Sequence, residues 1–234
     1  MSDLKIVELP IEFEWNGQTQ TLYPSLMIVN QELTLVDTGY PDFLGRIEKA
    51  ISENGYSPSR LKNIIITHYD IDHIGSLYDF KAKYPRVTII ASKKESASIS
   101  GKMKSERLRQ AEEMLVQMTE KEKEFGRWFI GQLQKLKHVP VDLEVSEGDL
   151  LLDGLCTVLE TPGHTSGHIS LYAPSIHSVI TGDAAVFENG ELAVANPHYC
   201  LDLPAAEQSL ARLKHLKADT YYCYHGGTYR LRQI

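Results

Sequence analysis

Four apolar, strand-like runs in this chain are each followed closely by a histidine or an aspartate. The clearest run, residues 64–66, consists of three isoleucines and leads directly into Thr67-His68-Tyr69-Asp70-Ile71-Asp72-His73. Successive β-branched apolar residues are typical of a strand that is covered on both faces. A loop behind such a strand is anchored in the core, and its imidazoles and carboxylates are the groups that bind divalent first-row metals. This segment predicts metal ligands at the edge of a buried sheet, although by itself a solvated polar loop would explain it equally well.

The other three runs make the metal site the better interpretation. Residues 155–160 lead to His164, residues 178–181 to Asp183, and residues 220–224 to His225, each beside glycines that allow a tight turn. A single Gly-His or Gly-Asp pair is weak evidence for a ligand. Four strand ends that each deliver one or more ligands predict a site built on rigid elements.

Size and composition narrow the functional classes. The chain has 234 residues, which predicts one domain over residues 1–234, and its net charge of −7 argues against a broad nucleic-acid surface. No apolar run approaches the roughly 18 residues needed to span a bilayer, and residues 1–5 lack the pattern of a signal peptide. Three cysteines without paired spacing imply no disulfide framework. We therefore expect a cytoplasmic protein without a membrane or nucleic-acid partner.

Strand and helix signals alternate along most of the chain. The predicted strands and helices are a hairpin over residues 26–29 and 33–36, a helix over 44–54, strands over 63–67 and 87–91, a helix between those two strands, short strands over 149–152, 155–160, 168–173 and 178–183, a helix around 205–216 and a last strand over 220–224. Strands interleaved with helices over this length favour two packed sheets with helices outside.

Residues 92–138 differ in character, because apolar residues recur there at helical spacing among lysines and glutamates. We interpret them as two amphipathic helices that form an insertion. For most of the apolar residues we favour simple packing on the domain. The alternative is that some of Met118, Phe125, Trp128 and Phe129 line a substrate entrance or form a homodimer surface, and the sequence does not separate these possibilities.

The ordered set of ligands resembles the metallo-β-lactamase-fold hydrolase superfamily. The usual signature there is H-x-H-x-D-H, then a single His, an Asp and a final His. The matching positions are His68, Asp70, Asp72, His73, His164, Asp183 and His225. Residues 36–39, 161–168 and 181–183 also resemble landmarks of that family, so the likeness spans roughly residues 26–227. It implies an α/β fold, an αββα sandwich of two mixed β-sheets flanked by helices, with a two-metal site on one edge.

The resemblance also implies a role for each ligand. The first metal is expected on His68, Asp70 and His164, and the second on Asp72, His73 and His225, while Asp183 bridges the two. Asp37 and His168 are expected to hydrogen-bond around the ligands rather than to bind metal. Tyr199 or His198 could donate to a developing oxyanion, as tyrosines do in some lactonase members, although a surface loop anchored by an aromatic residue is an equally good interpretation.

Asp70 departs from the family pattern, because a histidine is usual at that position. Two divalent ions facing three aspartates and one bridging hydroxide have no net formal charge, whereas a histidine at residue 70 would leave one positive charge. A more anionic first site favours Mn²⁺ or Fe²⁺ relative to Zn²⁺, although Zn²⁺ also accepts carboxylate ligands. We therefore expect two divalent ions, with zinc, manganese and iron all open.

The leading interpretation is a dinuclear metal-dependent hydrolase. By the resemblance, a metal-bridging hydroxide would attack an ester, lactone or thioester of a small molecule, and Asp72 would orient the hydroxide and carry a proton to the leaving group. Hydrolysis of a β-lactam or of a phosphodiester is less favoured. A di-iron redox protein for O₂ or NO chemistry with a separate flavin partner is the second class, because the flavin-linked branch of the family also has an acidic residue at this position. A non-enzymatic metal-binding protein is the third.

Overall fold

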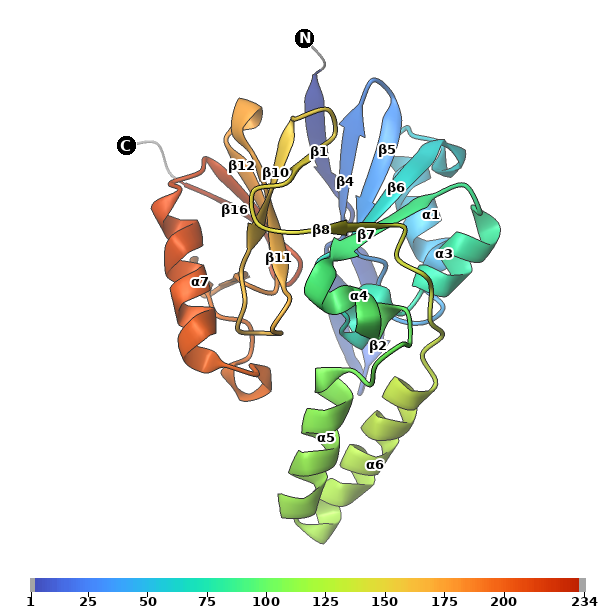
Figure 1. Cartoon of the computed structure of the whole chain (residues 1–234), viewed down its shortest axis with the longest axis vertical. Coiled ribbons are helices and arrows are strands. Elements are labelled where there is room, and N and C mark those ends of the chain that lie inside the picture. The colour runs from blue at the N-terminus through green and yellow to red at the C-terminus, as the bar shows by residue number, and fades with distance from the viewer. Residues whose placement is uncertain (1–2, 232–234) are drawn as a thin grey trace.

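The computed structural model describes residues 3–231, in which two β-sheets stack face to face (Figure 1). The first sheet has the strand order β1 (Leu4–Glu8), β4 (Ser25–Val29), β5 (Glu32–Val36), β6 (Leu61–Ile66), β7 (Thr88–Ser92) and β8 (Leu143–Val145). The second has the order β16 (Gly227–Arg230), β15 (Thr220–Cys223), β12 (Ser178–Gly182), β11 (Ile169–Ala173), β10 (Cys156–Glu160) and β9 (Leu150–Leu151). Both sheets mix parallel and antiparallel pairs.

Helices cover the outer faces of both sheets. Helices α1 (Leu44–Glu53) and α3 (Leu77–Lys83) lie on the first sheet, and α7 (Leu203–His215) lies on the second (Figure 1). The buried side of α1 is formed by Ile47 and Ile51, which lie four residues apart and therefore on one helical face. The expected αββα sandwich is confirmed.

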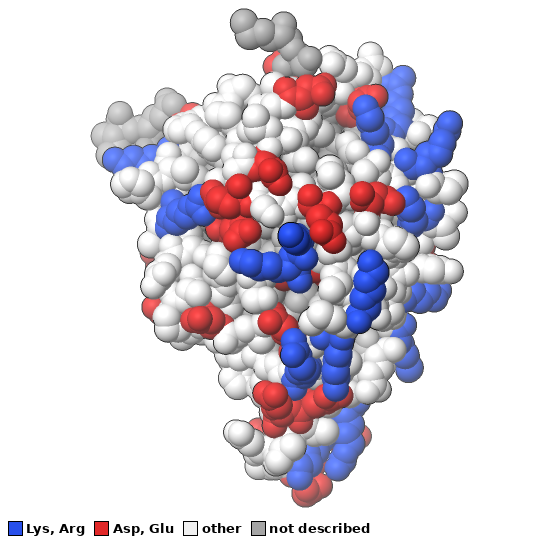
Figure 2. Space-filling model, in the orientation of Figure 1, with Lys and Arg blue, Asp and Glu red and all other residues white. Residues whose placement is uncertain are grey.

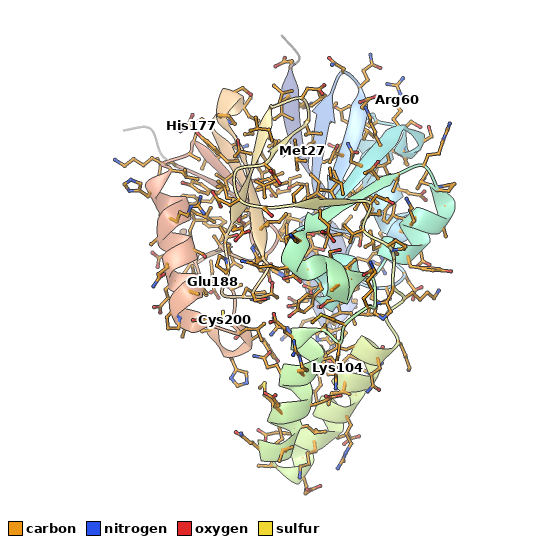
Figure 3. The ribbon with its side chains drawn as sticks, in the orientation of Figure 1. Met27, Arg60, Lys104, His177, Glu188 and Cys200 are labelled. Atoms are coloured by element: carbon orange, nitrogen blue, oxygen red, sulfur yellow. The ribbon has the colours of Figure 1, made fainter. Side chains whose placement is uncertain are left out.

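The three consecutive isoleucines explain how the first sheet is held on both sides. Ile64 and Ile66 belong to the cluster that packs under α1 and α3, whereas Ile65 belongs to the cluster between the two sheets. Met27 lies in that same intersheet layer (Figure 3). Side chains of a strand alternate between its faces, so an unbroken apolar run fills both cores at once.

The carboxyl ends of four strands meet at one edge of the sandwich. In the second sheet, β10 and β12 each pair antiparallel to β11, and β15 pairs parallel to β12, so β10, β12 and β15 point the same way. The backbone N–H of Ile169 donates to the carbonyl of Thr67 over 3.0 Å and joins the second sheet to the end of β6. The segments that follow β6, β10, β12 and β15 therefore share one edge.

Two hairpins near this edge were not predicted. Residues 11–22 form β2 (Ile11–Trp15) and β3 (Gln18–Leu22), and β13 (Val186–Glu188) pairs with β14 (Glu191–Ala193). The sequence of β3, Gln-Thr-Gln-Thr-Leu, is mostly polar and exposed, so it has no buried face that an apolar alternation would reveal.

The region 92–138 contains three helices rather than the two that we expected. Helix α4 (Lys93–Ile99) follows β7 directly, because the hydroxyl of Ser92 accepts from the N–H of Glu95 and begins the helix. Helices α5 (Glu106–Gln117) and α6 (Glu120–Gln134) then form a hairpin that extends away from the sheets (Figure 1). We call α5 and α6 the helical hairpin. Its use as a homodimer surface stays a prediction.

The surface gives no sign of a continuous basic face on the side drawn in Figure 2, where basic and acidic side chains are interspersed. Within residues 3–231, no helix combines the length and the apolar character that crossing a membrane requires.

Candidate metal centre

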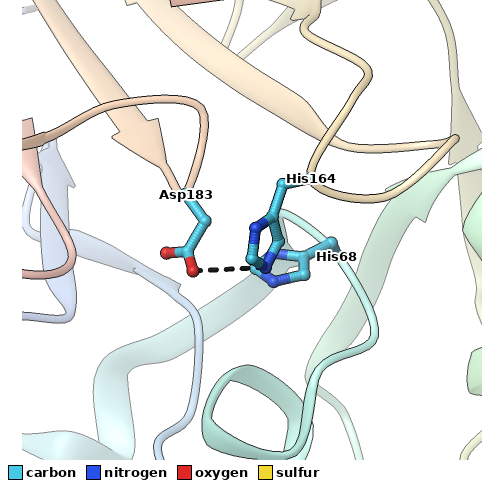
Figure 4. Close-up of side chains that lie close together, drawn as sticks. All are labelled: His68, His164 and Asp183. Carbon is cyan, nitrogen blue, oxygen red and sulfur yellow. Dashed lines mark ion pairs between the residues drawn. The ribbon is translucent and has the colours of Figure 1, made fainter. Parts of the chain in front are cut away.

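Three of the expected ligands form a first group at the shared edge. His68 follows β6, His164 follows β10 and Asp183 follows β12, and their ligand atoms lie within 4.8 Å of one another (Figure 4). Nε2 of His164 is 3.4 Å from Oδ2 of Asp183. All three residues are buried, so the strand ends have converged as the sequence predicts.

A second group lies beside the first. Asp72 and His73 belong to the short helix α2 (Ile71–Ile74), and His225 follows β15. Nε2 of His225 is 3.3 Å from Oδ2 of Asp72, and Nε2 of His73 is 3.7 Å from the same oxygen. These ligand atoms also lie within 4.8 Å of one another.

Asp183 lies between the two groups and turns one oxygen toward each. Its Oδ1 is 3.3 Å from Nε2 of His73 and 3.5 Å from Nε2 of His225, whereas its Oδ2 faces His164. The preceding Gly182 has a φ of +54°, and a Cβ there would lie 2.6 Å from the ring of His168. Only glycine fits this close approach, which sets the direction of Asp183.

The donor set fits divalent metal ions. Nε2 of His68, Nε2 of His73 and Oδ1 of Asp183 are buried without a hydrogen-bond partner. Buried polar atoms without a hydrogen bond are costly, so several of them gathered at the two ligand groups indicate sites for cations. Although burial raises the pKa of a carboxyl group, the histidines around Asp183 hold its pKa well below its ordinary value. The carboxylate is therefore ionised, the form that binds metal.

Hydrogen bonds fix the two histidines of the 68–73 segment. Oδ2 of Asp37 lies 2.9 Å from Nδ1 of His73 and 2.8 Å from the hydroxyl of Thr67, which donates to it. With its one proton used in this way, the hydroxyl of Thr67 accepts from Nδ1 of His68 at 3.0 Å. Both imidazoles are thus protonated on Nδ1, which leaves the Nε2 lone pairs for a metal.

His168 has both ring nitrogens occupied. Its Nε2 accepts from the backbone N–H of Asp183 at 2.9 Å, so its Nδ1 carries the proton and donates to the hydroxyl of Thr161 at 2.8 Å. Burial, together with the neighbouring His68, lowers the pKa of His168 well below its ordinary value and keeps the ring neutral. A neutral ring with no spare nitrogen orients Asp183 and has no lone pair for a metal.

Asp70 lies against the first group but is paired with an arginine. Nη2 of Arg107 donates to Oδ2 of Asp70 at 2.6 Å, and Nε donates to Oδ1 at 2.9 Å. Oδ2 also lies 3.0 Å from Nε2 of His164. Burial alone would raise the pKa of the carboxyl group of Asp70, but Arg107 and the two histidines hold it well below its ordinary value. The role of Asp70 as a metal ligand stays a prediction.

Arg107 comes from α5, and sequence reasoning missed it. Its guanidinium is buried, and it also donates to the backbone carbonyl of Tyr199. Arg107 and Ala111 are the buried positions of α5 and lie four residues apart on one face. An arginine on the apolar face of an amphipathic helix is the one signal in the sequence that would have singled it out.

A cleft of about 1450 Å³ opens above both groups. Trp15 of β2 and Trp128 of α6 stand in its wall with their ring centroids 5.5 Å apart, and Tyr40 stacks on Trp15. Burial and the carboxylates of the centre raise the pKa of Tyr40, which keeps its phenol protonated. Of the predicted entrance residues, Phe125, Trp128 and Phe129 line this cleft, and Met118 lines a smaller pocket beside it.

Tyr199 lies at the rim of the cleft in a short 3₁₀ turn, Pro197–Tyr199, and 37% of its surface is exposed. The side-chain amide of Gln110 on α5 donates to the carbonyl of the following Cys200 over 3.5 Å (Figure 3). His198 borders the smaller pocket. The loop is therefore linked to the first ligand group by Arg107, which donates both to the carbonyl of Tyr199 and to Asp70.

Comparison with known proteins places this geometry in a family. A family model described as the metallo-beta-lactamase superfamily matches residues 23–225. Hydroxyacylglutathione hydrolases from Chelativorans sp. (strain BNC1) and Brucella anthropi are 28% and 30% identical over 183 residues, which are 76% of this chain and 52% of each relative. The chain thus spans about half the length of these relatives.

Solved structures agree on the fold. A metallo-beta-lactamase family protein from Thermus thermophilus superposes with a TM-score of 0.71 at 23% identity, over 96% of this chain and 74% of that one. The family model covers the strand ends that supply both ligand groups, from β4 to His225. The chain belongs to the metallo-beta-lactamase superfamily.

Proposed function

We propose that this protein is a metal-dependent hydrolase that cleaves an ester, thioester or lactone of a small molecule with an apolar acyl or aryl group. The observation that carries the proposal is Asp183, whose two oxygens face two separate groups of histidines at the floor of an aromatic cleft. This arrangement supports a dinuclear centre with one divalent ion at each group and Asp183 between them.

The family implies divalent metal ions. The buried Nε2 atoms of His68 and His73, which have no hydrogen-bond partner, fit such ions. When bound, such ions supply a hydroxide near neutral pH and polarise the acyl carbonyl. Asp72 directs one oxygen, Oδ2, toward His225 and His73, which leaves its other oxygen to orient water and to pass a proton to the leaving group. Tyr40 and Tyr199, both in the cleft, are the phenols that would donate to the oxyanion.

The substrate class follows from the walls of the cleft. Phe13, Trp15, Phe125, Trp128 and Phe129 give it a partly aromatic lining. Such walls favour an apolar group, because aromatic side chains bury large areas on contact. Hydroxyacylglutathione, the substrate named for the relatives, is a thioester, and thioesters belong to the proposed class. Glu12, Glu14 and Glu188 also line the cleft and disfavour a polyanion such as nucleic acid.

The test is reconstitution of the metal-free protein with Zn²⁺, Mn²⁺ or Fe²⁺, followed by elemental analysis and assay. The assay panel contains lactones, thioesters, carboxylic esters, β-lactams and phosphodiesters. We expect bound metal and turnover of acyl substrates that rises as the acyl chain lengthens. Bound metal with turnover confined to phosphodiesters or β-lactams would contradict the proposed substrate class. Failure to bind any of the three metals would contradict the proposed chemistry.

A further inference from the structure

Arg107 brings a positive charge to the first ligand group. Its side chain is 4% exposed, its Nη2 lies 3.2 Å from Nε2 of His164, and it makes a two-pronged pair with Asp70. Arginine does not lose its proton in proteins, so this charge is permanent. The guanidinium is therefore a fixed cation beside the nitrogen with which His164 would bind a metal.

The two ligand groups consequently differ in net charge. The charges of Asp70 and Arg107 cancel, so the first group keeps only Asp183, which it shares with the second. The second group has Asp183 and Asp72. Like charges repel more strongly in a buried site than in water, so a divalent ion is disfavoured next to Arg107. In addition, the N–H groups of Arg107 compete with a metal for the lone pair of His164 and for the oxygens of Asp70.

We propose that the Asp70–Arg107 pair makes the two ligand groups unequal as metal half-sites. The second half-site, the group of Asp72, His73 and His225, binds its divalent ion first, and the first half-site, the group of His68 and His164, binds one more weakly. The pair is a unit of zero net charge that lies against His68 and His164. Arg107 is a positioning residue in this scheme. The inference rests on the proposed metal centre. The metal affinities of the two half-sites should differ by roughly 10- to 100-fold, which is the usual effect of changing a residue that hydrogen-bonds to a metal ligand.

The test is titration of the metal-free protein with Zn²⁺ and with Co²⁺, followed by calorimetry, and elemental analysis after dialysis at controlled free metal. The wild type should bind two ions in two separated steps. Arg107→Leu frees the carboxylate of Asp70 for the metal, so its two steps should move together. Arg107→Lys keeps the charge and should keep the steps separate. Arg109→Leu changes an exposed arginine on the same helix and is the matched control.

A second readout does not depend on the number of steps. Without metal, Arg107→Leu leaves the buried carboxylate of Asp70 without its arginine partner, so the melting temperature should fall and should then rise more than that of the wild type when Zn²⁺ is added. If Arg107→Leu does not fold, the double variant Asp70→His with Arg107→Leu restores a neutral pair and should bind two ions with similar affinity.

The outcomes separate this inference from the proposed function. Equal affinities in the wild type, or separated steps that persist in Arg107→Leu or in the double variant, would overturn the inference while leaving the metal centre intact. Absence of metal binding in every variant would overturn the proposed function itself.

Discussion

Asp37 holds His73 through a contact of 2.9 Å between Oδ2 and Nδ1. Asp37 has a φ of +64°, an unusual backbone conformation for a residue with a side chain, and its carboxylate also accepts from the N–H and the hydroxyl of Thr67. One buried carboxylate thus sets the orientation of the segment that carries four of the expected ligands. Strain at such a residue persists because three hydrogen bonds hold it in place.

The variant Asp37→Asn tests this arrangement. Asparagine tolerates the left-handed backbone conformation, so the fold should be kept, but an amide is a weaker acceptor for the Nδ1 proton of His73. We expect the affinity of the second half-site for Zn²⁺ to fall by about 10- to 100-fold. Competition with a chelator measures the loss, with circular dichroism to check the fold. An unchanged affinity would show that Asp37 serves only the backbone.

Asp183→Asn removes the carboxylate that both groups share. Because each of its oxygens faces a different group, we expect weaker binding at both half-sites and turnover at the background rate, with the fold retained. Elemental analysis and an esterase assay measure the two effects. Asp219→Asn is the matched control, because Asp219 pairs with His177 on the surface. Full activity in Asp183→Asn would exclude a mechanism that depends on two metals.

The raised pKa of the buried Glu95 should make the stability of the folded protein depend on pH. It is buried beneath the His164 loop, where its Oε1 accepts from Thr165 and from the N–H of Gly167, and burial raises its pKa from 4.5 to about 8. A raised folded-state pKa means that the folded protein holds the proton more tightly than the unfolded chain. The resulting stability is fully present below about pH 4.5 and is lost as the pH rises from there to about 8, at up to about 1.4 kcal/mol for each pH unit.

The variant Glu95→Gln keeps the shape of the neutral acid and cannot ionise. We expect its melting temperature to exceed that of the wild type above about pH 8 and the two to converge at low pH. Differential scanning calorimetry over this range provides the comparison. Glu113→Gln, an exposed substitution on α5, should follow the wild type at every pH. A constant difference between Glu95→Gln and the wild type across the range would contradict a titrating Glu95.

The only two tryptophans of the chain, Trp15 and Trp128, both stand in the cleft wall and make binding there visible. Carboxylates with long alkyl chains should change the tryptophan fluorescence of the wild type, whereas acetate should not. Phe125→Ala should weaken this binding by about tenfold, which corresponds to one aromatic contact. Val116→Ala, on the exposed end of α5, should leave it unchanged. A response that is the same for every chain length would argue against an apolar subsite.

The sequence predicts that the candidate ligands converge, because most of them lie within a few residues of a strand end. His68, His164, Asp183 and His225 follow β6, β10, β12 and β15, so local chain geometry carries them to the shared edge. The sandwich itself is predictable for a related reason, since the run of isoleucines in β6 requires apolar layers on both faces of its sheet.

Arg107 was not predictable in this way. It lies 37 residues beyond Asp70, on a helix whose packing direction depends on the tertiary fold. Charged residues in amphipathic helices are normally solvated, so this general rule predicts an exposed Arg107 rather than the buried one that the structure has. The prediction that Asp70 makes the centre more anionic omitted this partner, and the ion pair offsets that charge. The polar β2–β3 hairpin was missed because its strands gain their place from tertiary pairing.

Arg107 also connects two parts of the molecule, the ligand groups at the sheet edge and the helical hairpin that lines the cleft. Its guanidinium holds Asp70 and the carbonyl of Tyr199, while its backbone belongs to the helical hairpin whose other helix carries Trp128. Any displacement of the helical hairpin would therefore also displace the cation that neutralises Asp70. Under the proposed function, the size of the group bound in the cleft would in this way affect the charge at the ligand groups.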